Sequence, residues 1–124
     1  LTPLLRPGAS TGLDYYPLVT PGERFPVNDP HLPPRLTPRP TDDAVFLQAM
    51  LEGMARIEAM GYTTLASLGA SPLQSMRTTG GGAANEAWTA IRARALGVPL
   101  RPSVSAHAAV GTARLAWRGV GHAC

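Results

Sequence analysis

The sequence predicts an α/β domain, with helices against a sheet, behind an irregular proline-rich arm. Ten of the 13 prolines precede residue 41, helical periodicity begins immediately afterwards, and the rest of the chain alternates helix, strand, helix, strand and helix. With 124 residues and 44% hydrophobic content, the chain suits one domain and is too short for two ordinary ones. We divide it into an arm over residues 1–40 and a domain portion over residues 41–124.

The arm contains one predicted strand, over residues 13–19, ahead of a turn at Pro21-Gly22. Its other prolines exclude helix, because each ring removes a backbone N–H and pushes the preceding residue out of the α region. We expect the arm to wrap a surface and not to build a core. Tyr15 and Tyr16 should divide between core and surface, since neighbouring side chains alternate across a strand.

The first helix should begin at Asp43, with Thr41 as the capping hydroxyl and with Asp42 and Asp43 at the positive end of the helix dipole. The two carboxylates could resemble a metal-binding or acid/base pair, but adjacent helical side chains point about 100 degrees apart. We therefore expect both to cap the helix. The end of this helix is open. It either stops at Gly61 or continues past that weak position to Gly69.

Helical periodicity after residue 43 predicts one buried apolar stripe. The polar residues expected to fall mostly outside this stripe are Gln48, Glu52, Arg56 and Glu58. The stripe itself consists of Phe46, Leu47, Met50, Leu51, Met54 and Ile57.

A second strand is predicted over residues 74–79, followed by three glycines at 80–82 and a helix over about residues 84–96 that Gly97 ends. Arg92 and Arg94 should point to solvent from the outer face of this helix. The residues expected to face the core are Ala84, Trp88, Ile91 and Ala95.

The chain should close with an extended stretch over residues 98–102 and a last helix over 106–118, capped by Ser105 and ended by Gly119. Residues 87–124 carry five arginines and no acid. This basic part of the chain could attract an anion, and solvated arginines explain the pattern equally well.

Composition removes several kinds of chemistry. All eleven basic residues are arginine, which excludes a phosphate-loop lysine, a Schiff base and a lysine general base. Cys124 stands alone, so an internal disulfide is excluded and a reducing compartment is expected. His31, His107 and His122 lack the spacing of a zinc finger, and no metal site is predicted.

The sequence contains no run of about 18 apolar residues that could cross a membrane as a helix. The chain begins at Leu1 without a signal segment. We expect a cytoplasmic protein that is a piece of a longer one, with neither a membrane nor a nucleic acid as partner.

The glycine run is the best candidate for a binding site: Gly80, Gly81 and Gly82 lie between a predicted strand and the start of a helix. Backbone without Cβ atoms can approach a ligand closely, and the helix start favours a phosphate. Asn85 could pair with an adenine edge, and Trp88 could form a flat wall for the base. A plain tight turn, a capping Asn85 and a core Trp88 remain alternatives. The spacing fits neither the dinucleotide fingerprint nor the standard phosphate loop.

Three stretches resemble the C-terminal domain of FGGY-family carbohydrate kinases. TGGGAANEAWTAI at residues 79–91, with LGVP at 96–99, is similar to the family's adenosine-binding segment. LEGMA at 51–55 and AAVGTARLA at 108–116 resemble the helices on either side of it. The arm, with GLDYYP at 12–17 and ERFP at 23–26, most resembles the plant and cyanobacterial D-ribulose/xylulose-type branch.

The resemblance implies part of a ribonuclease H-like, actin-like ATPase fold, in which sugar and ATP meet between two domains. It implies that Gly81 and Gly82 lie against the α-phosphate and ribose, that Asn85 contacts adenine and that Trp88 walls the adenine pocket. ATP with Mg²⁺ would be the cofactor, and the sugar would be bound mainly by the missing N-terminal part. The family's catalytic Asp belongs to that part, so the chain alone should be inactive. His107 stands where many relatives have Glu.

The expected function is therefore that of a C-terminal, adenosine-binding fragment of an ATP-dependent sugar kinase acting on a pentulose. The alternative is a non-catalytic nucleotide-binding or protein-interaction module. In that case the same glycine turn holds ATP or nothing, and the proline-rich arm docks a partner.

Overall fold

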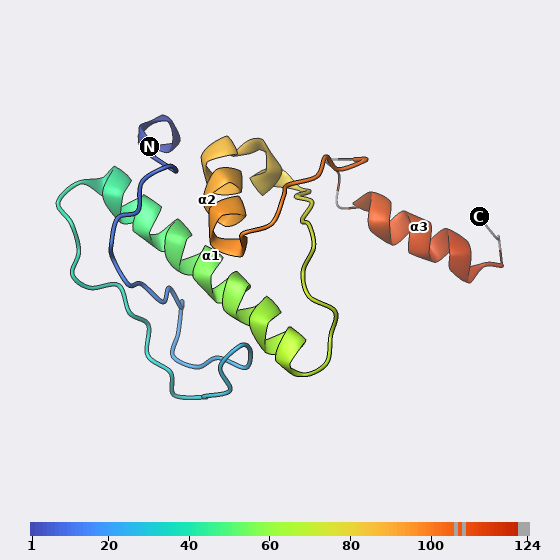
Figure 1. Cartoon of the computed structure of the whole chain (residues 1–124), viewed down its shortest axis with the longest axis horizontal. Helices are drawn as coiled ribbons and strands as arrows, with labels where there is room; N and C mark the ends of the chain where they lie inside the picture. The colour runs from blue at the N-terminus through green and yellow to red at the C-terminus, as the bar shows by residue number, and fades with distance from the viewer. Residues whose placement is uncertain (106, 108, 122–124) are drawn as a thin grey trace.

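A computed structural model of the chain describes residues 1–105, 107 and 109–121. Helix α1 is the long central helix, and α2 packs against it (Figure 1). Most of the arm runs along the side of α1 that faces away from α2 (Figure 1). Helix α3 extends away from the body (Figure 1). The helices in chain order are the 3₁₀ helix η1 (Thr2–Leu4), α1 (Asp43–Ser67), the 3₁₀ helix η2 (Gly81–Ala84), α2 (Glu86–Leu96) and α3 (Ala109–Gly119).

The expected sheet is not confirmed. Over the described residues, β structure consists of isolated bridges that join Tyr16 to Arg35, Glu23 to Asp29 and Met76 to Leu100. The predicted strands over 13–19 and 74–79 are thus extended segments with one bridge each. Prolines lie next to the bridge partners of these two segments, at 33 and 34 before Arg35 and at 99 and 102 around Leu100. A proline has no N–H and cannot donate the next hydrogen bond of a ladder.

The third bridge joins the two extended segments that precede and follow α2. The N–H of Met76 donates to the carbonyl of Pro99 at 3.1 Å, and the N–H of Arg101 donates to the carbonyl of Met76 at 2.8 Å. The two segments run parallel, with η2 and α2 between them in the chain. The predicted arrangement of strand, glycine turn and helix is therefore present locally, without a sheet.

Helix α1 begins at Asp43 as predicted, but its cap is Asp42 and not Thr41. The Asp42 carboxylate accepts a hydrogen bond from the N–H of Ala44 at 2.8 Å. Asp43 forms an exposed ion pair with Arg39 at 2.6 Å. Both carboxylates therefore serve the start of the helix, which agrees with the capping role expected for them.

Of the two ends that the sequence left open for α1, the longer is the one observed. The helix continues through Gly61 to Ser67, and the chain then turns at Gly69 with φ of 97°. A Cβ on Gly61 would lie 3.0 Å from the ring of Phe25. Glycine at this position thus lets an aromatic side chain of the arm pack directly onto the helix.

The predicted buried face of α1 is wrong. Residues of the apolar stripe are half-buried or exposed, and Met54 is 45% exposed. The arm lies so close to the helix that a Cβ on Gly53 would come within 2.6 Å of the Tyr15 carbonyl oxygen. Small residues, and polar ones that bond to the arm, therefore occupy this face. The buried residues are Ala44, Gln48, Ala49, Glu52, Gly53, Ala55 and Gly61.

The arm was expected only to wrap a surface, yet it supplies part of the core through Leu5, Tyr15 and Tyr16. The predicted division of the tyrosines is also wrong, since both are buried. Tyr15 packs edge-on against Phe46 at 5.8 Å between ring centroids, whereas the backbone of Tyr16 pairs with Arg35. The Tyr15 ring therefore packs on α1, whereas Tyr16 is tied to the folded-back arm through its backbone.

Helix α2 ends as predicted, at Leu96 with Gly97 in the left-handed conformation at φ of 64°. Its predicted core face is confirmed in part. Ile91 is buried, Trp88 and Ala95 are half-buried, and Ala84 is exposed in η2.

Arg92 and Arg94 do not point freely into solvent, contrary to expectation. Arg92 pairs with Glu58 and Arg94 pairs with Glu52. Both acceptors lie on α1, so the two arginines hold α2 against α1.

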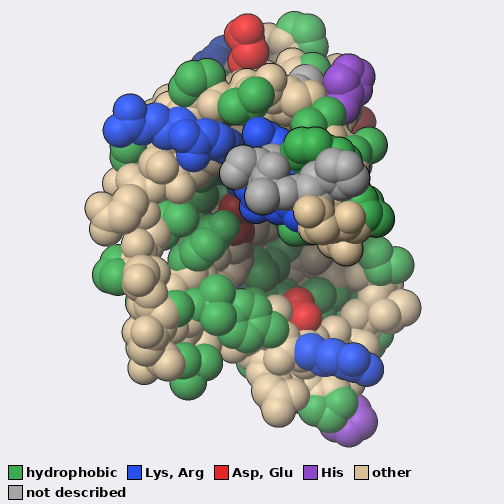
Figure 2. All heavy atoms as spheres, turned by 90° about the vertical axis from the view of Figure 1, so that its right-hand side faces the viewer, with side chains coloured by type: hydrophobic (Ala, Val, Ile, Leu, Met, Phe, Trp, Pro, Cys, Tyr) green, Lys and Arg blue, Asp and Glu red, His purple; other side chains and the backbone are tan. Residues whose placement is uncertain are grey.

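Helix α3 begins at Ala109 instead of residue 106, and its described residues are all exposed. The hydroxyl of Ser105 accepts a hydrogen bond from the N–H of His107 at 3.1 Å. Cys124 and His122 lie outside the described residues. Figure 2 views this end of the molecule, where arginine side chains gather in the upper half and the face is hollowed below. None of the helices, over their described residues, has the length and hydropathy that a membrane span requires.

Candidate functional site

The glycine turn combines one strained residue with a helical turn. Gly80 has φ of 79° and ψ of −172°, a conformation essentially restricted to glycine. Gly81 and Gly82 have no positive φ and instead begin η2. The N–H of Ala83 donates to the Gly80 carbonyl at 3.0 Å, which closes this turn. A positive φ, which glycine adopts readily, is therefore needed at the first glycine of the run.

The turn is open to its surroundings. Gly81 and Gly82 are exposed and Gly80 is half-buried. A Cβ built on Gly80 or Gly81 would meet nothing within 4 Å. This is the accessibility that a backbone contact to a ligand requires.

Asn85 caps α2, as one of the two readings of the sequence anticipated. Its side-chain oxygen accepts a hydrogen bond from the N–H of Trp88 at 3.0 Å. Its amide nitrogen has no hydrogen-bond partner within the part of the chain that the structure describes. The amide oxygen of Asn85 therefore caps the helix, and its amide nitrogen can donate a hydrogen bond to a ligand.

Asn85 also borders a mostly apolar hollow of about 540 Å³ between η1 and the start of α2. Glu86 is the charged side chain at its edge. The lining residues are Thr2, Pro3, Leu5, Pro7, Ala84, Asn85, Glu86, Ala87 and Ala90.

Trp88 does not line that hollow; it supports the glycine turn. Two atoms of its indole, Cδ1 and Nε1, lie 3.5 Å from the place where a Cβ on Gly82 would be. The Arg92 guanidinium lies over its ring, 5.5 Å from the centroid. The structure therefore brings Trp88 together with Gly82 and places Asn85 at the neighbouring hollow.

Arg92 belongs to this site although the sequence did not indicate it. Its Nε donates to Glu58 at 2.7 Å and its Nη1 donates to the hydroxyl of Thr78 at 2.8 Å. The hydrogen bond with Glu58 raises the pKa of Arg92 above its ordinary value, although burial acts in the opposite direction. The spacing of four between Trp88 and Arg92 was the signal available in the sequence, because such residues share a helix face.

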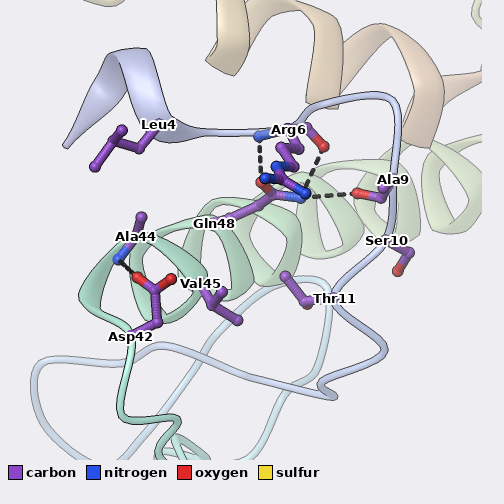
Figure 3. A pocket seen from close by; sticks show the side chains of 9 residues that line it. All are labelled: Leu4, Arg6, Ala9, Ser10, Thr11, Asp42, Ala44, Val45 and Gln48. Carbon is purple, nitrogen blue, oxygen red and sulfur yellow. Dashed lines mark hydrogen bonds between the residues drawn. The ribbon is translucent and has the colours of Figure 1, made fainter.

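A second polar cluster lies where the arm crosses α1 (Figure 3). The Gln48 amide accepts from the N–H of Arg6 at 2.7 Å and donates to the carbonyl of Ala9 at 2.7 Å. Its amide nitrogen also donates to Glu52 at 3.1 Å. The hollow of about 400 Å³ beside them is bordered by groups that already bond to one another. This cluster holds the arm against α1.

Metal ligands are not assembled in this part of the protein. Over the described residues, no three His, Cys, Asp or Glu side chains come together as a metal site. His107 is exposed.

The chain matches the model of a known family. The model of the FGGY family of carbohydrate kinases, C-terminal domain, matches residues 7–120, which include most of the arm, the glycine turn and helices α1, α2 and α3. Kinases of this family are phosphotransferases that use ATP and Mg²⁺, and this domain generally has a ribonuclease H-like fold. The match covers most of the chain and includes the open turn described above. The chain belongs to the FGGY family of carbohydrate kinases and carries its C-terminal domain.

Proposed function

We propose that this chain supplies the adenosine-binding half of an ATP-dependent kinase whose phosphoryl acceptor is a pentulose, in the plant and cyanobacterial ribulose/xylulose-type branch. The observation that carries the proposal is the open glycine turn, which presents exposed backbone directly before α2. The resemblance of the arm supports the branch and the sugar class. The expected reducing compartment supports a cytoplasmic location.

In this proposal the turn receives the phosphate and ribose. The backbone at Gly81 and Gly82 lies against them, because no Cβ intervenes and the positive end of α2 follows within a few residues. Gly80 provides the bend that exposes them. Trp88 supports the turn through its contact with Gly82.

Adenine is proposed to enter the hollow beside the turn. Its volume of about 540 Å³ lies within the range of about 300 to 1,000 Å³ typical of small-molecule sites. Its apolar walls suit a flat ring, and the amide nitrogen of Asn85 can donate to a ring nitrogen of adenine. Capping and base recognition by Asn85 are compatible, since they use different atoms of one amide.

The chain binds and orients the nucleotide, and the chemistry is proposed to come from the rest of the kinase. Phosphoryl transfer needs an acceptor hydroxyl in line with the γ-phosphorus and its leaving oxygen, together with a base and Mg²⁺. The described residues assemble no metal site, so we assign the base, the Mg²⁺ ligands and most sugar contacts to the N-terminal part of the enzyme. The 124 residues alone should not phosphorylate D-ribulose or D-xylulose, and ATP-dependent product formation by them would contradict this assignment.

The binding proposal is tested by titrating ADP into the ¹⁵N-labelled chain and following amide chemical shifts. We expect movement centred on residues 80–88. Gly81→Ala should weaken binding without loss of structure, because the new methyl group projects into open space where the nucleotide is proposed to lie. Gly111→Ala, an equally open position on α3, is the matched control and should bind as the wild type does. Unmoved signals over 80–88 would remove the proposal.

A further inference from the structure

Arg92 connects the two sides of the glycine turn. Its guanidinium donates to both carboxylate oxygens of Glu58 on α1, at 2.7 and 2.5 Å. A third hydrogen bond, of 2.8 Å, reaches the hydroxyl of Thr78, two residues before Gly80. The same group therefore fixes the segment that enters the turn to the helix that leaves it.

Trp88 is the third residue that this guanidinium contacts. The Arg92 carbon Cζ lies 5.5 Å from the centroid of the Trp88 ring, within the range of a cation–π interaction. The indole in turn touches the position where a side chain on Gly82 would begin. A continuous set of contacts thus runs from Glu58 through Arg92 and Trp88 to Gly82.

Burial and hydrogen-bond geometry strengthen the ion pair between Arg92 and Glu58. The side chains of Arg92 and Glu58 are 14% and 25% exposed, so solvent and salt screen the pair less than an ion pair at the surface. The planar guanidinium matches the carboxylate with two parallel bonds and still offers a third donor. A lysine ammonium cannot reproduce this geometry.

We propose that Arg92 is a positioning residue for the nucleotide. By holding Thr78 before the turn and Trp88 after it, Arg92 keeps Gly80 to Gly82 in the conformation that receives the adenosine end of ATP. The inference rests on the proposed nucleotide site. Without Arg92 the turn must be ordered at the moment of binding, and that ordering weakens affinity.

The test compares Arg92→Met with Arg39→Met in the full 124-residue chain. Arg39 also lies over an aromatic ring, that of Phe46 at 4.2 Å, and also pairs with a carboxylate, that of Asp43. It lies far from the turn in the sequence and is a matched control. The readouts are ADP affinity by calorimetry and the indole N–H signal of Trp88, assigned with a Trp117→Phe variant.

We expect Arg92→Met to move the Trp88 indole signal and to weaken ADP binding about tenfold, equivalent to about 1.4 kcal/mol. Arg39→Met should change neither. Because Arg92→Met leaves the Glu58 carboxylate unpaired and so lowers stability, Thr78→Val and Arg92→Lys provide milder tests. Thr78→Val removes only the third hydrogen bond, and Arg92→Lys keeps the charge without the fork. Both should weaken ADP binding by less than Arg92→Met while circular dichroism stays unchanged.

The outcomes separate the two levels of the argument. If the wild type binds ADP and folded variants at Arg92 and Thr78 bind equally tightly, the positioning role is overturned and the nucleotide site stands. If the wild type shows no binding of ADP, the nucleotide site and the positioning role fall together. A parallel loss of affinity and shift of the indole signal, absent at Arg39, supports the inference.

Discussion

Glu52 on α1 accepts a hydrogen bond of 3.0 Å from the guanidinium of Arg94 on α2, although 42 residues separate them in the chain. Glu52 is 4% exposed, whereas Arg94 is 38% exposed. Glu52 also accepts bonds from the backbone N–H and the hydroxyl of Thr11, at 3.1 and 2.7 Å. One carboxylate therefore joins the arm, α1 and α2.

Replacing Glu52 should destabilise the protein strongly. Glu52→Ala removes a buried acceptor that Thr11 and Arg94 share, together with one of the acceptors of Gln48. We expect a loss of about 3 kcal/mol in the free energy of unfolding. Urea denaturation followed by circular dichroism measures it. Asp14→Asn is the control: Asp14 is 74% exposed and pairs with Arg35, so its loss should cost less than about 1 kcal/mol. Similar losses at the two positions would contradict the central role of Glu52.

Stability should fall at acid pH through the same carboxylate. Burial raises the pKa of Glu52, but hydrogen bonds from Thr11, Gln48 and Arg94 outweigh burial and leave the pKa below its ordinary value. A lowered pKa in the folded state stabilises the fold above the unfolded pKa of about 4.3 and loses this contribution as pH falls below it. Unfolding free energies measured between about pH 6 and about pH 3 should decline more steeply for the wild type than for Glu52→Gln. Equal slopes would show that Glu52 does not carry the effect.

Local chemistry made two of the helix boundaries predictable. The start at Asp43 and the stop at Gly97 follow from capping preferences that act within one turn. The end of α1 was open because the effect of Gly61 depends on Phe25, which packs against it from the arm. A contact between residues so far apart in the sequence leaves no local signal.

The buried face of α1 could not be read from polarity. Placing Gln48 and Glu52 outside the buried stripe assumes that the helix packs on apolar side chains. Here it packs on the backbone of the arm, whose N–H and carbonyl groups need polar partners, and Gln48 and Glu52 supply them. The sequence therefore predicted a helix correctly and predicted the wrong face.

The candidate site divides in the same way. The glycine turn that begins at Gly80 and the capping role of Asn85 were both anticipated, because each depends only on residues adjacent in the sequence. The support beneath the turn was not, because Arg92 and Glu58 lie 34 positions apart on different helices. Sequence reasoning located the turn and missed what holds it.

Gly53→Ala should destabilise the protein although alanine is the better helix former. A Cβ at this position would lie 2.6 Å from the Tyr15 carbonyl oxygen and 3.0 Å from Cδ of Pro17. The clash with backbone displaces the arm and should exceed the gain of about 1 kcal/mol in helix propensity. Thermal unfolding measures the balance. Gly111→Ala, where a Cβ meets nothing within 4 Å, should leave stability unchanged or raise it, and the same sign for both variants would argue against the close approach of the arm.

Adjacent glycines of the turn should respond differently to alanine. Neither position is crowded, since a Cβ on Gly80 or Gly81 meets nothing within 4 Å, so any difference reports on the backbone conformation. Gly80 has φ of 79°, where an L-residue costs on the order of 1 to 3 kcal/mol, whereas Gly81 has no positive φ. Gly80→Ala should therefore lower the unfolding free energy or rearrange the turn, and Gly81→Ala should leave both unchanged. Chemical shifts of residues 79–85 and urea denaturation of both variants measure this. An equal response would show that Gly80 does not hold the bend on which the nucleotide site depends.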